Sequence, residues 1–216
     1  MGRFARWAPL SGVVFAALWV VAILLFGDGP GDTDQEIASF YDSDDNRDDQ
    51  SLAWALVALA TLFFLWFLAE LRVRLLAAEG QPARLTALAF GSGLVSAVLF
   101  LLSMTVWAAT SFAHDEAEFS ADPGTVRLLD STGYVLWASA GSMSIPLVVA
   151  VSLIALRTRV FPVWLGWVGL VLALALIIAF AFIPVLALFA WVALLGILMS
   201  WQPAAPRSAA GPVPPA

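Results

Sequence analysis

The stretch YDSDDNRDDQ at residues 41–50 holds five aspartates among ten residues, in a chain that is otherwise strongly apolar. Alternate residues in it carry oxygen-bearing side chains: Asp42, Asp44, Asn46 and Asp48. This spacing resembles the start of the calcium loop D-x-[DN]-x-[DN]-G-x5-E, in which alternate residues offer oxygen ligands to a hard cation. The match is partial, because Arg47 stands in place of the glycine and Ala53 in place of the bidentate glutamate.

A second interpretation of the same residues needs no metal. Moving a carboxylate into the bilayer costs about 2.5–3.5 kcal/mol on insertion scales, so a segment this acidic must stay in water. Asp48 and Asp49 would also precede a helix, where negative charge complements the helix dipole. The stretch is then a polar anchor beside a membrane helix.

A second acidic segment contains the only histidine, in the run HDEAE at residues 114–118. His114 and Glu118 would share one face of a helix, a spacing that metal sites use. The run lacks a second histidine and is not a zinc-protease motif. A divalent-cation site and a solvated loop both remain open for this segment.

Hydroxyl and small residues mark one face of each of two apolar segments. In the segment 85–110, Ser92, Ser96, Ser103 and Thr110 fall on one helical face, and the segment 131–156 contributes Ser139 and Ser142. Close helix packing through small residues and short hydrogen bonds is one interpretation. The other is a polar cavity, opened by a kink at Pro146 and lined by four serines. Those serines are Ser96, Ser103, Ser139 and Ser142.

These residues must be positioned by membrane helices. Of the 216 residues, 62% are hydrophobic and 12% are charged, whereas a soluble domain has about 25% charged residues. Apolar stretches of about 20 residues can cross the hydrocarbon core of a bilayer. We therefore predict an all-α, polytopic transmembrane bundle in one domain, residues 1–201, with acidic loops at 27–50 and 111–127 and a disordered tail at 202–216. The expected helices are 8–26, 51–69, 85–110, 131–156, 162–180 and 184–201.

The arginines predict how the chain is threaded. Six crossings with both termini in the cytoplasm would place eight of the ten arginines inside and only Arg47 and Arg127 outside, as the positive-inside rule requires. Five crossings are the alternative, which would place Arg207 outside. The expected location is the cytoplasmic (inner) membrane of a bacterium, and the arginine-rich, lysine-free composition suggests a high-GC genome.

Several function classes are excluded or disfavoured by what the sequence lacks. There is no cysteine, which excludes disulfides and thiolate chemistry, and there is no basic stripe for nucleic acid. No aspartate, glutamate, lysine, arginine or histidine falls inside the expected spans, where proton-driven transporters and membrane enzymes usually carry one. We predict no enzyme activity and no cofactor. The expected partners are the bilayer and either another membrane protein or a second copy of the chain.

Four stretches resemble an uncharacterised family of bacterial integral membrane proteins, common in high-GC Gram-positive bacteria and described only as a domain of unknown function. They are FYDSDDNR (40–47), WFLAELRVRLLAAEG (66–80), RLTALAFGSG (84–93) and LRTRVFPVWLGWVGLVLA (156–173). The resemblance implies a six-helix membrane protein and supplies no catalytic residues. The leading functional hypothesis is a non-enzymatic accessory, scaffold or envelope component that acts through protein or lipid contacts. The alternative is a carrier or permease for a small neutral or amphiphilic compound.

Overall fold

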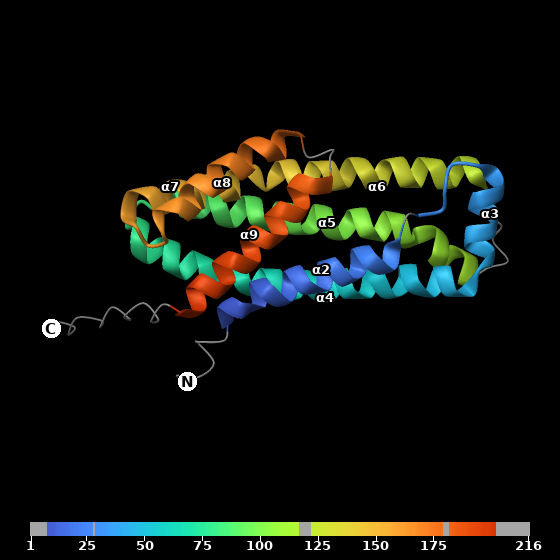
Figure 1. Cartoon of the computed structure of the whole chain (residues 1–216), viewed down its shortest axis with the longest axis horizontal. Helices are drawn as coiled ribbons and strands as arrows, with labels where there is room; N and C mark the ends of the chain where they lie inside the picture. The colour runs from blue at the N-terminus through green and yellow to red at the C-terminus, as the bar shows by residue number, and fades with distance from the viewer. Residues whose placement is uncertain (1–7, 28, 117–121, 179–181, 202–216) are drawn as a thin grey trace, which may run out of the picture.

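A computed structural model describes residues 8–27, 29–116, 122–178 and 182–201, and within these ranges the chain forms the predicted all-α bundle (Figure 1). The N-terminal tail, the tail at 202–216 and with them Arg3, Arg6 and Arg207 lie outside the described residues. The elements are η1 (Ala8–Leu10), α2 (Ser11–Phe26), α3 (Asp34–Asp42), α4 (Asp44–Glu79), α5 (Arg84–Glu116), α6 (Pro123–Met143), α7 (Ile145–Thr158), α8 (Val163–Ala175), η2 (Leu176–Ile178) and α9 (Phe182–Trp201).

Two helices are much longer than the apolar runs that predicted them. α4 has 36 residues and α5 has 33, so at 1.5 Å per residue each is about 50 Å long, against about 30 Å for the hydrocarbon core. The expected ranges 51–69 and 85–110 cover only their apolar parts. The helices continue past the bilayer because nothing breaks them there: α4 begins at the Ser43 cap and ends only at Gly80, whose φ is 71°.

The expected acidic loop 27–50 is largely helical. α3 occupies its middle and the first turns of α4 its end, and Figure 1 shows α3 lying across one end of the bundle. The start of α3 is fixed by a capping box: Thr33 Oγ1 accepts from the Glu36 N–H at 3.2 Å, and Glu36 accepts from the Thr33 N–H at 2.9 Å. The expected loop 111–127 is likewise shortened by α5 and α6, whose ends approach it from both sides.

The expected fourth span, 131–156, is divided into α6 and α7. The break falls at Ser144, two residues before Pro146, because proline cannot donate the backbone hydrogen bond that a continuous helix needs. α6 also starts earlier than expected, at Pro123, where Asp122 caps the helix by accepting from the Thr125 N–H at 2.9 Å.

α8 and α9 form a hairpin that is shorter than the rest of the bundle. Five helical stretches of the described chain are long and apolar enough to cross a membrane, and Val163–Ile178 is a shorter apolar helix beside them. Phe182, at the start of α9, stacks on Trp137 at 4.8 Å, in the middle of the α6–α7 segment. In Figure 1 the start of α9 lies part of the way along the bundle, and its end lies beside the start of α2.

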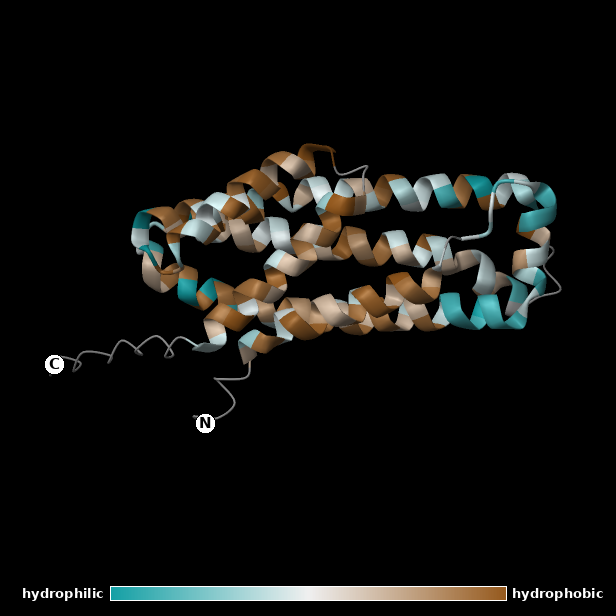
Figure 2. Ribbon diagram, in the orientation of Figure 1, coloured by the Kyte–Doolittle hydropathy of each residue, from teal (hydrophilic) through white to brown (hydrophobic). Residues whose placement is uncertain are grey.

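The outer faces of the helices are as apolar as the inner ones. On α4, Phe64 and Phe67 are buried while the neighbouring Leu62 and Trp66 are 62% and 53% exposed. A helix that is apolar all round is typical of a membrane span. Figure 2 shows this apolar character along the middle of the bundle, with hydrophilic residues at its two ends. The chain is therefore a polytopic membrane protein.

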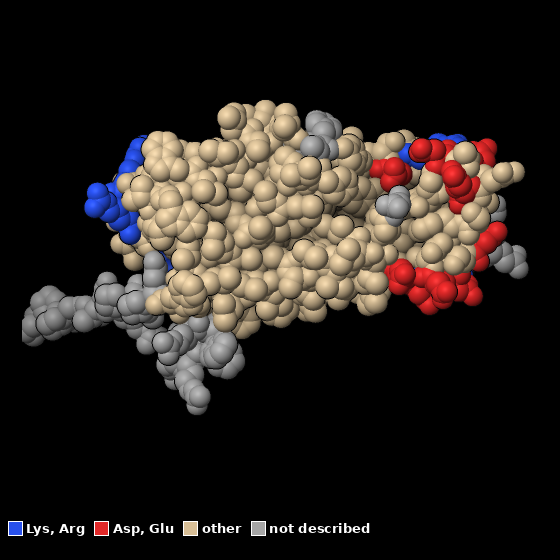
Figure 3. Space-filling model, viewed as in Figure 1, with Lys and Arg blue, Asp and Glu red and all other residues tan. Residues whose placement is uncertain are grey.

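Charge is separated between the two ends of the bundle (Figure 3). We call one the arginine end; it carries Arg72, Arg74, Arg84, Arg157 and Arg159, together with Glu70 and Glu79. The other is the acidic end, with α3, the first turns of α4 and the start of α6; it carries Arg47, Arg127 and the acids Asp32, Asp34, Glu36, Asp42, Asp44, Asp45, Asp48, Asp49, Asp122 and Asp130.

The helices pack through aromatic side chains and glycines. Trp19 of α2, Phe100 of α5, Trp137 of α6 and Phe189 of α9 meet at the centre, with ring centroids 5.1–6.1 Å apart. Nearer the arginine end, α9 crosses the start of α2 at Gly196, where an added Cβ would lie 2.6 Å from the Pro9 carbonyl oxygen.

Candidate functional site

The four oxygen-bearing residues of the first acidic segment lie at the corner between α3 and α4. Asp42 ends α3, and Asp44 begins α4 and pairs with Arg47. Asn46 donates to the Phe40 carbonyl oxygen at 3.2 Å, which holds the corner together. Residues two apart on an α-helix point about 200° apart, so Asp44, Asn46 and Asp48 do not converge as they would in a loop.

His114, the histidine candidate, does not form a cluster with these aspartates. His114 is half-buried near the end of α5, and Glu118, its expected partner, lies outside the described residues. Within the described ranges, no group of three or more histidine, aspartate or glutamate side chains is placed to hold a metal ion.

The four serines expected to line a cavity make hydrogen bonds to helix backbones instead. Two of them join α5 to the α6–α7 segment: Ser103 donates to the Gly133 carbonyl oxygen at 2.7 Å, and Ser96 to that of Ala140 at 2.9 Å, while Ser96 also bonds the Ser144 hydroxyl at 2.6 Å. Ser139 and Ser142 bond the carbonyl oxygens four residues earlier in α6. The hollow at Ser96 measures only about 10 Å³.

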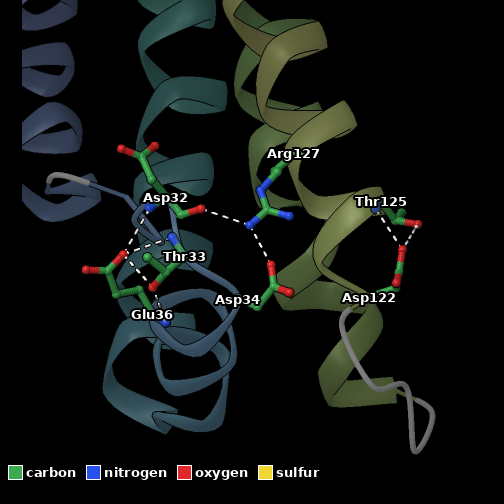
Figure 4. A network of polar contacts seen from close by, with 7 residues as sticks. All are labelled: Asp32, Thr33, Asp34, Glu36, Asp122, Thr125 and Arg127. Atoms are coloured by element: carbon green, nitrogen blue, oxygen red, sulfur yellow. Dashed lines mark hydrogen bonds and ion pairs between the residues drawn. The ribbon is translucent and has the colours of Figure 1, made fainter.

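At the acidic end, Arg127 fastens α3 to α6 (Figure 4). Its Nη2 donates to the Asp32 carbonyl oxygen at 2.8 Å and forms an ion pair with Asp34 Oδ1 at 2.5 Å. Next to it, the Glu36 carboxylate accepts from the backbone N–H groups of Asp32 and Thr33 at 3.2 and 2.9 Å. The segment before α3 is therefore held from both sides.

The two capping carboxylates are stabilised in their charged form. Hydrogen bonds from the Thr33 backbone, then from its hydroxyl, lower the pKa of Glu36 below 4.5. The Thr125 backbone N–H and hydroxyl likewise lower the pKa of Asp122 below 3.8.

A buried polar cluster seats the other end of α3 on α4 and α5. Gln50 is 1% exposed and accepts a hydrogen bond from the Ser111 hydroxyl. Tyr41 is buried beside them, and burial raises the pKa of its hydroxyl despite side-chain hydrogen bonds with Thr110 and Gln50. This cluster was not predicted, because Gln50 and Ser111 are 61 residues apart and no local pattern connects them.

A pocket of about 530 Å³ opens beside Arg127, between the end of α2, the segment before α3, α5, α6 and the first residue of α9. This size is within the range of small-molecule sites, about 300–1,000 Å³. Its outer part is lined by polar and glycine-rich chain, including Asp32, Arg127, Asp130 and Ser131. Six aromatic side chains also line it, Phe26 and Trp107 near the level of Asp130 and the others further in: Trp19, Tyr134, Trp137 and Phe182.

The depth of this pocket follows from helix contacts. Trp107 Nε1 donates to the Asp130 carbonyl oxygen at 3.1 Å, so Asp130 lies level with Trp107. Ser111, which bonds Gln50 at the start of the apolar part of α4, is one helical turn or about 6 Å closer to the acidic end. From Asp130, Trp137 is seven residues or about 10 Å further in. The pocket therefore begins near the membrane boundary and reaches into the apolar zone.

Towards the arginine end the pocket is closed by the central aromatic cluster. Trp19 and Trp137 are 1% and 0% exposed, and Phe189 stacks on Trp19 at 5.1 Å. The next hollow beyond them is the small one at Ser96.

One feature of the sequence points to these buried rings. Trp19 falls in the middle of an apolar span, away from the interfaces where membrane tryptophans usually lie, as does Trp191. Both are buried inside the bundle. Exposed tryptophans, in contrast, include Trp164, Trp167 and Trp201 near the arginine end, as an interfacial belt requires.

Compared with known proteins, the chain matches no family model, no curated protein and no solved structure. The resemblance to an uncharacterised membrane family therefore stays a prediction, and the pocket has to be interpreted from its own geometry.

Proposed function

We propose that the chain is a non-enzymatic protein of the bacterial cytoplasmic membrane, an accessory or envelope component that acts by binding an amphiphilic molecule in the pocket at its acidic end. The arginine end would face the cytoplasm and the acidic end the outside, following the positive-inside rule. The observation that carries the proposal is the pocket itself, with a polar mouth near the membrane boundary and aromatic side chains further in.

An amphiphile fits this position because its two halves would meet the surroundings that they prefer. Its polar group would lie beside Asp32, Asp130 and Ser131, and its apolar body among the rings below. Aromatic side chains bury large apolar areas and dominate the energetics of such sites.

A carrier for a small neutral or amphiphilic compound is the second candidate. The reach of the pocket into the apolar zone favours it, since carriers hold their substrates at membrane depth. The packed rings of Trp19, Trp137 and Phe189 weigh against it, because a carrier must also open towards the other side.

The threading can be tested by labelling, because the chain has no native cysteine. Asp45→Cys lies at the exposed acidic end and Gln81→Cys between α4 and α5, at the arginine end. A membrane-impermeant maleimide should label Asp45→Cys in intact spheroplasts, and Gln81→Cys only after permeabilisation. The reverse pattern would contradict the proposed orientation.

Binding can be tested with 4-bromobenzyl alcohol, a neutral amphiphile whose bromine quenches tryptophan fluorescence. In lipid nanodiscs, part of the quenching should saturate, whereas partition into protein-free discs does not. Ser131→Trp, which fills the pocket mouth, should abolish the saturable part. Thr132→Trp is the matched control, since Thr132 is exposed next to it and is not among the pocket-lining residues. Equal quenching in both variants would exclude the pocket as the binding site.

A further inference from the structure

We infer that the pocket selects a small organic cation with an apolar body, such as a quaternary or alkylated ammonium compound. This inference rests on the proposed function, that the pocket binds a ligand at all. It adds the sign of the ligand's charge, which three features of the pocket indicate independently.

The first feature is the aromatic interior. Rings from α2, α5, α6 and α9 line the pocket, and Trp107 packs on Phe26 and Trp137 with ring centroids 5.4 and 6.1 Å apart. Because Trp19 and Trp137 are 1% and 0% exposed, the accessible ring surface comes mainly from Phe26, Tyr134 and Phe182. The face of an aromatic ring carries negative potential, and several rings around one space attract ammonium groups, above all those that are weakly hydrated.

The second feature is the charge at the mouth. Asp32 and Asp130 line the pocket together with Arg127, but the Arg127 guanidinium is already paired with Asp34. Asp130 makes no ion pair with any described residue. The mouth therefore has three carboxylates, those of Asp32, Asp130 and Asp34, and one guanidinium, that of Arg127. This excess of negative charge favours a cation in the mouth.

The third feature is that the groups at the mouth that could bind an anion already hold carboxylates of the chain itself. Backbone N–H groups ahead of a helix often bind phosphate or carboxylate. Here those of Asp32 and Thr33 donate to the Glu36 carboxylate, and Figure 4 shows Arg127 turned towards Asp34 on the opposite side. An anionic ligand at the position of the Glu36 or the Asp34 carboxylate would have to displace these internal contacts, whereas a cation leaves them intact.

The test compares benzyltrimethylammonium with neopentylbenzene, in which an uncharged carbon replaces the ammonium nitrogen. Each is titrated against bound 4-bromobenzyl alcohol in phosphatidylglycerol nanodiscs. Binding is compared between wild type, Asp130→Asn and Asp48→Asn in identical discs, so that the attraction of the lipid surface for cations cancels. Asp48→Asn removes the same charge from an exposed site on α4 away from the pocket lining.

Wild type should bind the cation about tenfold more tightly than Asp130→Asn does, and Asp48→Asn should match wild type within about twofold. Neopentylbenzene should bind all three proteins equally. If Asp130→Asn folds poorly, Asp32→Asn serves as a second variant, and it should also bind the cation more weakly than wild type.

The possible failures are distinct. If 4-bromobenzyl alcohol shows no saturable site, the proposed function fails. If it binds but Asp130→Asn and Asp32→Asn leave the affinity for the cation unchanged, the pocket is a ligand site without charge selection and the present inference is overturned. Repeating the titration in phosphatidylcholine discs separates two sources of the ligand. If the site takes lipid headgroups, choline headgroups will compete and lower the apparent affinity for the free cation. If the site takes free molecules only, that affinity will be unchanged.

Discussion

Replacing Gly196 by alanine should separate α9 from the start of α2. The new Cβ would lie 2.6 Å from the Pro9 carbonyl oxygen, about 0.8 Å short of the 3.4 Å at which ordinary contact begins, and 3.6 Å from the Gly12 Cα. The obstacle is backbone, so no side chain can rotate away and the two helices must move apart. Overpacking of this kind costs typically about 1–3 kcal/mol.

The matched control is Gly91→Ala in α5, because nothing lies within 4 Å of the Cβ that it would add. Both variants gain the same intrinsic helix preference of alanine over glycine, about 0.5–1 kcal/mol, and this gain cancels when they are compared. Gly196→Ala should therefore be less stable than Gly91→Ala by about 1–3 kcal/mol. A difference near 2 kcal/mol corresponds to roughly 4–8 °C in melting temperature.

Thermal unfolding in one detergent, followed by circular dichroism with both variants side by side, measures this difference. If Gly196→Ala melts at the same temperature as Gly91→Ala or above it, the close approach of α9 to the Pro9 carbonyl is wrong. That result would also remove the basis for placing the end of α9 against the start of α2.

The other predictions concern the acidic end and the contacts between helices. Arg127→Gln should speed amide hydrogen exchange in α3, because it removes the ion pair to that helix; unchanged exchange would show that the pair does not hold it. The pKa values of Glu36 and Asp122 are lowered, so their capping contributes fully above about pH 5 and should be lost as the pH falls below 4.5 and 3.8, seen as lower amide protection factors at the starts of α3 and α6, each referred to the intrinsic exchange rate at that pH; protection factors that stay constant as the pH drops would refute it. Ser103→Ala should cost about 0.6 kcal/mol of stability by removing a bond between helices, whereas Ser139→Ala, which loses a bond within its own helix, should cost less; equal losses would argue against a role for the Ser103 contact.

The apolar runs were enough to predict the class of fold, because hydrophobic length and the exclusion of charge from lipid act on each segment separately. The ends of the helices were harder to predict. α4 continues from Ser43 to Glu79 because a helix follows its own caps and not the bilayer boundary. The sequence did contain the missed signals: Thr33-x-x-Glu36 is a capping box, and Asp122-Pro123 is a helix start.

The pocket could not have been predicted in the same way. Its walls come from Trp19, Trp107, Trp137 and Phe182, which lie on four helices and meet only because of the angles at which those helices cross. Hydroxyl spacing pointed to Ser96 and Ser103, and these residues do face a neighbouring helix. Their hydroxyls bond carbonyl oxygens of that helix at less than 3 Å, so the helices close on each other there and leave no comparable space.

The short α8–α9 hairpin gives the molecule a tapered outline in the membrane. On the arginine side, α8 and α9 add to the cross-section of the bundle, whereas beyond Phe182 the described part of the bundle continues with α2, α4, α5 and α6. Such a body displaces more lipid from one monolayer than from the other. Copies gathered in a patch of membrane would therefore favour curvature that gives the arginine-side monolayer the larger area, and would concentrate where the membrane is already bent in that direction.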